Sequence, residues 1–194
     1  APTFIVPKKL NPGETTSTPK ARVVSDFRKL NECLVRHPYP VPKIQHTLQT
    51  LEGFMHGTSL DLIQGYYQMP LDSPSKKKCT IVVPWGKYEY EVLPQGLSNS
   101  PDIFQENMLN LFRDLTFVRE YIDDLLITSN GTLDDHLIKV EQVLQRLHKA
   151  GLKVNANKSK FCRKEVEYLG YLVTRVGIKP QAKKVQAIHN MATP

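Results

Sequence analysis

The chain has little cysteine and no long apolar segment, and each of these absences excludes some classes of protein. No run of about 18 apolar residues and no signal-peptide pattern occurs, so we expect no membrane span and no membrane partner. The cysteines, Cys33, Cys79 and Cys162, are odd in number and widely spaced. This spacing excludes a C-x-x-C zinc pattern and a dense disulfide framework, and it favours free thiols in a reducing compartment.

The composition is that of a globular protein with a basic excess. Forty per cent of the 194 residues are hydrophobic and 23% are charged, and 26 basic against 19 acidic residues give a net charge of +7. Such an excess favours a polyanionic partner, nucleic acid above all, although a merely basic soluble protein would carry the same charge. The length fits one domain or two closely packed lobes. The ends lack a natural-looking start, so we interpret the chain as a piece of a longer one.

Two adjacent acids, Asp123 and Asp124, stand between short apolar runs that favour strands. This pattern predicts a hairpin with the acids at its bend, yet no Gly or Asn is present to relax that bend. Two carboxylates held together repel unless a proton or cation lies between them, and Mg²⁺ prefers oxygen ligands of this kind. An exposed turn with two solvated acids is the simpler alternative.

A third acid, Asp61, is embedded in the apolar, strand-like run 59–63. A strand interior disfavours Asp, and a buried acid is costly unless it is paired or bound to metal. We therefore expect a buried acid on a strand beside the 121–126 hairpin. The alternative is an edge-strand acid that faces water.

The remaining pattern predicts strands and helices in alternation. We expect strands at 4–6 and 21–27 around a loop at 11–19, a helix from Pro42 that ends at Gly53, and a hairpin at 79–92. A helix capped by Ser100 and a helix from Thr132 to Gly151 should follow, the second with an inner face of Leu137, Val140, Leu144 and Leu147. Strands at 152–155 and 166–173 complete an order compatible with a split βαββαβ unit.

Four ordered segments carry a specific resemblance. The segments SLDLIQGYYQM (59–69), LPQGLSNSPDIFQ (93–105), YIDDLL (121–126) and EYLGY (167–171) are similar to the reverse transcriptase motifs of gypsy-type long-terminal-repeat retrotransposons and of the related retroviruses. The resemblance extends to RVVSDFRKLN (22–31) and covers nearly the whole chain. Ile122 stands where the family usually has Val, Met or Leu, a change of similar bulk.

The resemblance implies an α+β fold, a polymerase palm with an antiparallel sheet backed by helices, plus a β-rich fingers subdomain. Residues 1–35 and 69–99 would be fingers, 36–68 and 100–180 palm, and 181–194 the start of a truncated thumb. The activity would be that of an RNA-directed DNA polymerase, which adds deoxyribonucleotides to a primer 3′-hydroxyl by two-metal-ion nucleotidyl transfer.

The resemblance also assigns residues to roles. The implied catalytic residues are Asp61, Asp123 and Asp124; the metal ligands Asp61, Leu62, Asp123 and Asp124; the nucleotide-binding residues Lys8, Arg22, Tyr66 and Gln95; and the primer grip Tyr168, Leu169, Gly170 and Tyr171. Among them, Tyr66 matches the aromatic residue that excludes a ribose 2′-hydroxyl. The implied cofactor is a pair of Mg²⁺ ions, with Mn²⁺ as a substitute.

The implied partners are an RNA or DNA template with its primer, deoxyribonucleoside triphosphates, and the thumb, connection and ribonuclease H regions of the same polyprotein. The implied location is the cytoplasm, within virus-like particles. Two alternatives stay open from the residues: an RNA-dependent RNA polymerase, against which Tyr66 speaks, and a non-catalytic nucleic-acid-binding module. A binding module has no need of an acid cluster that faces phosphates, so Asp61, Asp123 and Asp124 speak against the second.

Overall fold

The structure is a computed structural model that describes residues 1–7, 21–40, 44–49, 51, 53–181, 185–186 and 190. Lys8, the expected loop at 11–19 and most of the segment 181–194 lie outside the described residues. The chain divides into two compact units, Ala1–Pro38 with Tyr66–Phe104 (the first unit) and Tyr39–Gly65 with Gln105–Pro194 (the second unit). Within the described parts, no helix has both the length and the apolar character needed to cross a membrane.

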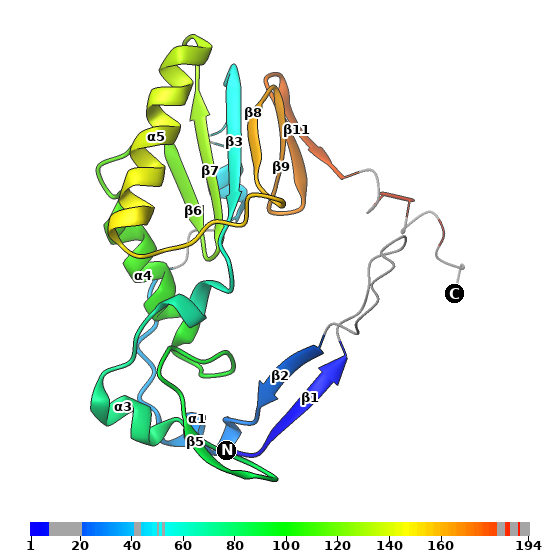
Figure 1. The fold of residues 1–194 in the computed structure, drawn as a ribbon. Helices are drawn as coiled ribbons and strands as arrows, with labels where there is room; N and C mark the ends of the chain where they lie inside the picture. The colour runs from blue at the N-terminus through cyan, green and yellow to red at the C-terminus, as the bar shows by residue number, and fades with distance from the viewer. Residues whose placement is uncertain are drawn as a thin grey trace. The chain divides into compact units, whose positions relative to one another are not determined.

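A four-stranded antiparallel sheet lies in the second unit, with the strand order β6-β7-β3-β8 (Figure 1). Its strands are β3 (His56–Asp61), β6 (Val118–Tyr121), β7 (Asp124–Ser129) and β8 (Lys160–Arg163). Helix α4 (Ser100–Phe112) precedes β6, and α5 (Leu133–Lys149) joins β7 to β8 and packs against the sheet. The order β3-α4-β6-β7-α5-β8 confirms the split βαββαβ arrangement and the α+β fold.

Helix α5 begins with the expected capping box, in which Thr132 and Asp135 exchange hydrogen bonds. Its predicted inner face is confirmed for Val140 and Leu147 but wrong for Leu137 and Leu144, which are 46% and 36% exposed. The buried residues are His136, Val140, Val143 and Leu147. The His136 ring nitrogens lie 2.8 Å from Thr58 Oγ1 and 2.9 Å from Ser129 Oγ, and these polar contacts to the sheet turn a histidine inward in place of the leucines.

The end of the chain pairs differently from expectation. No strand forms at 152–155, where Val154 makes only an isolated bridge to Leu62; the fourth strand of the sheet is β8. The expected strand at 166–173 is a hairpin of β9 (Glu165–Tyr168) and β10 (Tyr171–Thr174), extended by β11 (Gly177–Pro180). Leu169 and Gly170 form its turn with φ values of 49° and 81°. A leucine rarely adopts the left-handed conformation, so the pair Leu169-Gly170 does not look like a typical hairpin turn and was not predicted as one.

The first unit contains two antiparallel strand pairs, β1 with β2 and β4 with β5, both as expected. Its elements are β1 (Thr3–Pro7), β2 (Ala21–Ser25), α1 (Arg28–Cys33), α3 (Ser73–Lys78), β4 (Thr80–Val83) and β5 (Gly86–Glu89). Helices α1 and α3 were not predicted, because neither has a buried residue and so neither shows an apolar stripe.

Two further elements complete the part of the chain that the structure describes. Helix α2 (Ile44–Gln49) lies in the second unit where a helix was expected, and the 3₁₀ helix η1 (Gly65–Gln68) follows β3. Ser100 was expected to cap α4 with its hydroxyl, but that hydroxyl donates instead to the Pro94 carbonyl at 2.7 Å. The three cysteines are unpaired thiols, as expected.

Candidate active site

Asp61 and Asp124 lie directly opposite each other in neighbouring strands. Asp61 is the last residue of β3 and pairs with Asp124, the first residue of β7. Leu60 and Leu125, their neighbours on these strands, are at most 1% exposed and anchor the strand ends in the core. The Asp61 side chain is 30% exposed, so the prediction of a buried acid inside a strand was wrong. The strand ends at this residue, where solvent reaches the carboxylate.

Asp123 lies in the two-residue turn between β6 and β7, at the bend that the sequence predicted. Its neighbour Ile122 has a φ of 55°, a strained conformation for a β-branched residue. Two hydrogen bonds hold the turn: the Ile122 N–H donates to Gln105 Oε1 at 2.7 Å, and the Leu62 N–H donates to the Asp123 carbonyl at 3.3 Å. The acid therefore stands on a turn that its surroundings keep in place.

Gln105 is a positioning residue that the sequence reasoning did not single out. Its side chain projects from α4 and is fully buried, yet it accepts a hydrogen bond from the acid turn. The sequence offers one signal for it: Gln105 directly follows Phe104, in the helix that buries Phe104, Met108 and Phe112. A buried amide needs a polar partner, and here that partner is the backbone of the strained turn.

Negative charge accumulates at this end of the two central strands, β3 and β7. Desolvation, together with the charges of Asp123 and Asp61, raises the pKa of Asp124 to about 6, while Lys158 acts in the opposite direction. Repulsion between carboxylates and loss of water both disfavour the ionised form. The lowering effect of Lys158 on the Asp124 pKa is smaller than the raising effects of burial and of the two other acids.

Asp61 and Asp124 border a hollow of about 210 Å³ in the second unit. The turn residues Leu169 and Gly170 also line it, together with Lys158, Lys160 and Glu167. Tyr168 is buried in the core, where its hydroxyl donates to the Arg119 carbonyl at 3.3 Å and burial raises its pKa. Of the residues assigned to a primer grip, Tyr168 and the two turn residues, Leu169 and Gly170, thus line the acids' hollow.

The donor set fits a hard divalent cation. All the candidate groups are oxygens, from carboxylates or from the Leu62 carbonyl, and Mg²⁺ and Mn²⁺ prefer such ligands. The charges of Asp123 and Asp61 contribute to the raised pKa of Asp124, and a bound cation would offset this repulsion. In the part of the chain that the structure describes, no three carboxylates, imidazoles or thiols converge closely enough to hold an ion as they stand.

The other predicted site residues that the structure describes lie in the first unit. Tyr67 stacks on Tyr90 with ring centroids 6.2 Å apart. Burial and Tyr90 raise the pKa of Tyr67 to about 12, whereas the Arg22 charge and the Gln95 backbone lower it. Two of the predicted nucleotide-binding residues therefore act on Tyr67, Arg22 through its charge and Gln95 through its backbone. Tyr66 points elsewhere, with its ring edge-on to Phe104 at 5.4 Å.

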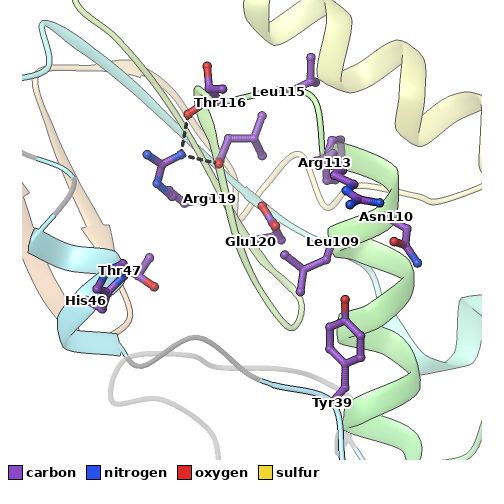
Figure 2. A pocket seen from close by; sticks show the side chains of 12 residues that line it. Tyr39, His46, Thr47, Leu109, Asn110, Arg113, Leu115, Thr116, Arg119 and Glu120 are labelled. Carbon is purple, nitrogen blue, oxygen red and sulfur yellow. Dashed lines mark hydrogen bonds between the residues drawn. The ribbon is translucent and has the colours of Figure 1, made fainter.

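A second, larger pocket of about 610 Å³ lies between α2, the end of α4 and β6, and contains none of the predicted site residues. Figure 2 shows Glu120 between Arg119 and Leu109 in this pocket. The Arg119 guanidinium donates to the carbonyls of Thr116 and Val118 at 2.6 and 2.9 Å. Burial raises the pKa of Glu120 to about 7, so this carboxyl is half-protonated near neutral pH.

Glu120→Gln is expected to stabilise the protein above pH 7 and to change little at pH 4.5. Because the pKa of Glu120 is raised from 4.5 to about 7 on folding, the wild type loses stability as pH rises through that interval. The full difference should be on the order of 3 kcal/mol. Urea unfolding at pH 4.5, 6 and 8 would measure it, with the exposed Glu106→Gln as a control. A difference between wild type and E120Q that does not grow with pH would contradict the raised pKa.

Comparison with known proteins places these features in a family. Residues 6–173 match the sequence profile described as reverse transcriptase (RNA-dependent DNA polymerase). The Pol polyproteins of the Drosophila melanogaster transposons opus and gypsy are 40% and 36% identical over the whole chain. The chain spans about a fifth of the length of these relatives, 19% of each.

The fold is also similar to solved structures. A foamy viral protease–reverse transcriptase, solved in complex with an RNA/DNA hybrid, superposes with a TM-score of 0.84 at 26% identity, over 100% of this chain and 25% of that one. The same foamy viral protein with double-stranded DNA gives 0.84 over 93% of this chain and 38% of that one, again at 26% identity. The antiparallel sheet with its helices and the β-rich first unit thus correspond to a polymerase palm and fingers fold.

Proposed function

This chain belongs to the reverse transcriptase family, and we propose on that basis that it carries the catalytic core of an RNA-directed DNA polymerase. The observation that carries the proposal is the pairing of Asp61 with Asp124 beside the turn that presents Asp123. Three acids at the ends of neighbouring strands repel one another and destabilise a protein that binds no cation between them. Such a cluster is suited to nucleotidyl transfer, in which metal-bound phosphates approach carboxylates.

The acids and one carbonyl act together as the metal-binding group. Asp61, Asp123, Asp124 and the Leu62 carbonyl would hold two divalent cations, Mg²⁺ or its substitute Mn²⁺. Bound there, such ions stabilise the attacking primer 3′-oxygen and the leaving pyrophosphate oxygen. Gln105 keeps the Asp123 turn in its strained form, so that the carboxylate does not have to be ordered during the reaction.

The first unit supplies the nucleotide contacts. Arg22 and Lys8 bind the triphosphate, the first able to do so with two parallel hydrogen bonds. Gln95 contacts the incoming nucleotide from the loop before α4, and Tyr66 excludes a ribose 2′-hydroxyl. The hairpin turn of Leu169 and Gly170, with Tyr168 and Tyr171 beside it, holds the primer end next to the acids' hollow; in support, both turn residues line that hollow.

In this proposal residues 1–35 and 69–99 serve as fingers, 36–68 and 100–180 as palm, and 181–194 begin a thumb. The partners are a primed RNA or DNA template, deoxyribonucleoside triphosphates, and the thumb, connection and ribonuclease H regions of a polyprotein. The working place is the cytoplasm, within virus-like particles. Because the template grip of such an enzyme depends on its thumb, this chain should bind primer–template more weakly than a longer one.

Primer extension tests the function directly. A labelled DNA primer on an RNA template should be extended by this chain with deoxyribonucleotides and Mg²⁺, and extension should stop in EDTA. A longer chain that includes the thumb region provides the positive control. Extension that is absent in both chains, or that persists in EDTA, would reject the proposal.

Binding of primer–template is expected to weaken steeply with salt, because the net charge of +7 favours phosphate contacts. Each neutralised phosphate should contribute a slope of about −0.9 to the plot of log affinity against log salt for duplex DNA. Fluorescence anisotropy between about 50 and 200 mM KCl would measure it. A flat dependence would show that the basic excess has no part in binding.

A further inference from the structure

Lys158 lies over one of the candidate metal ligands. Its ammonium nitrogen is 3.5 Å from both carboxylate oxygens of Asp61, and it lines the same hollow. The Lys158 side chain is 62% exposed, so most of it is in contact with solvent. A cation of the protein thus stands where the proposed function requires a cation from solution.

The backbone of the turn at 155–159 is fixed to Asp61. The Asn155 N–H donates to the Asp61 carbonyl at 2.8 Å, and the Asp61 N–H donates to Ser159 Oγ at 3.2 Å. The Ser159 hydroxyl in turn donates to the Asn155 carbonyl at 2.8 Å. Both backbone polar groups of Asp61 are therefore satisfied by this turn, which keeps the origin of the Lys158 side chain beside the carboxylate.

We infer that Lys158 is a built-in counter-ion that competes with divalent cations for Asp61. In metal-free protein it offsets part of the repulsion among Asp61, Asp123 and Asp124. A metal ion that binds Asp61 must displace the ammonium, because both need the same two oxygens. Lys158 thereby weakens metal binding and keeps the acids ordered until a metal arrives; the inference rests on the proposed role of the acids as metal ligands.

A matched control is present in the same hollow. The Lys160 ammonium pairs with the Glu167 carboxylate at 2.8 Å, and among the described residues it is Lys158, not Lys160, that pairs with Asp61. Lys158→Met and Lys160→Met remove the same charge from the same hollow, so general electrostatic effects on cation affinity should be similar in both. Only Lys158→Met removes a direct competitor from Asp61.

The test is a Mn²⁺ titration of metal-free protein, followed by the electron paramagnetic resonance signal of free Mn²⁺. K158M should bind Mn²⁺ roughly three- to tenfold more tightly than K160M, a difference of about 0.7 to 1.4 kcal/mol. Lys158→Arg, which keeps the charge, should resemble the wild type. In an Asp61→Asn background the K158M effect should vanish, because the shared ligand is gone.

The outcomes separate this inference from the proposed function. Mn²⁺ binding that is lost in Asp123→Asn but equal in K158M and K160M overturns the role of Lys158 and leaves the metal assignment standing. Binding that is absent in every variant overturns both. A K158M effect that survives in the Asp61→Asn background also contradicts the inference, because the gain would then not come from Asp61.

Discussion

Asp123→Asn is expected to lower the rate of Mg²⁺-dependent primer extension by about a thousandfold or more while the protein stays folded. The substitution keeps the size of the side chain but removes one of the charges that would hold the metal ions. The turn itself should persist, because its hydrogen bonds to Gln105 and Leu62 involve backbone groups of residues 122 and 123. Single-nucleotide extension under saturating Mg²⁺ measures the rate.

Stability provides the second readout for the same variant. Without metal, D123N should melt at the wild-type temperature or slightly above it, because the charge of Asp123 is one cause of the raised pKa of Asp124. Asp134→Asn, an exposed acid in the first turn of α5, is a control of equal chemistry outside the cluster. Extension by D123N at the wild-type rate would reject the metal assignment, and so would an equal loss in D134N.

The positions of the acid hairpin and of the main elements could be predicted because local pattern and long-range pairing agree there. The apolar runs that flank Asp123 and Asp124 become β6 and β7, and the strand that ends at Asp61 becomes their neighbour. Two strand runs joined by a short acidic bend allow few other pairings, and period-2 patterning then determines the face of each side chain.

The residues that support the acids could not be predicted, because their roles depend on contacts between distant segments. Lys158 is one of several basic residues between the strands expected at 152–155 and 166–173, and only the folded turn brings it to Asp61. Gln105 is separated from Ile122 by 17 positions. Neither position shows a local sequence feature that differs from an ordinary solvated lysine or a helical glutamine.

The two wrong positions in the predicted inner face of α5, Leu137 and Leu144, have a related cause. Hydropathy ranks Leu137 and Leu144 above His136, whereas the sheet offers two hydroxyls, from Thr58 and Ser129, at the inner position. A histidine whose two ring nitrogens are both bonded is well suited to that place, and burial together with His56 lowers its pKa. Hydrophobic periodicity identifies apolar side chains along one helix. It carries no information about hydrogen-bond partners on another element of the fold.

The two adjacent tyrosines of η1 differ in surroundings, and this difference makes them a matched pair. Tyr66 is partly buried with its ring edge against Phe104, whereas Tyr67 stacks on Tyr90 and has Arg22 and the Gln95 backbone near its hydroxyl. Tyr67→Phe removes only a hydroxyl and keeps the stacking ring. Tyr66→Val removes the ring that would reject a ribose.

Tyr66→Val is therefore expected to raise the ratio of ribonucleotide to deoxyribonucleotide incorporation by roughly tenfold or more, because a steric gate works through a clash with the wrong substrate. Tyr67→Phe should leave this ratio near the wild-type value, although loss of its hydroxyl beside Gln95 should raise KM for both nucleotides alike. The measurement is kcat/KM for each nucleotide class in each variant on the same primed RNA template. If Tyr66 only packs against Phe104, its truncation lowers thermal stability and both kcat/KM values together. An unchanged ratio in Y66V would place the gate at another residue and would remove the strongest argument that the sequence offers for DNA rather than RNA synthesis.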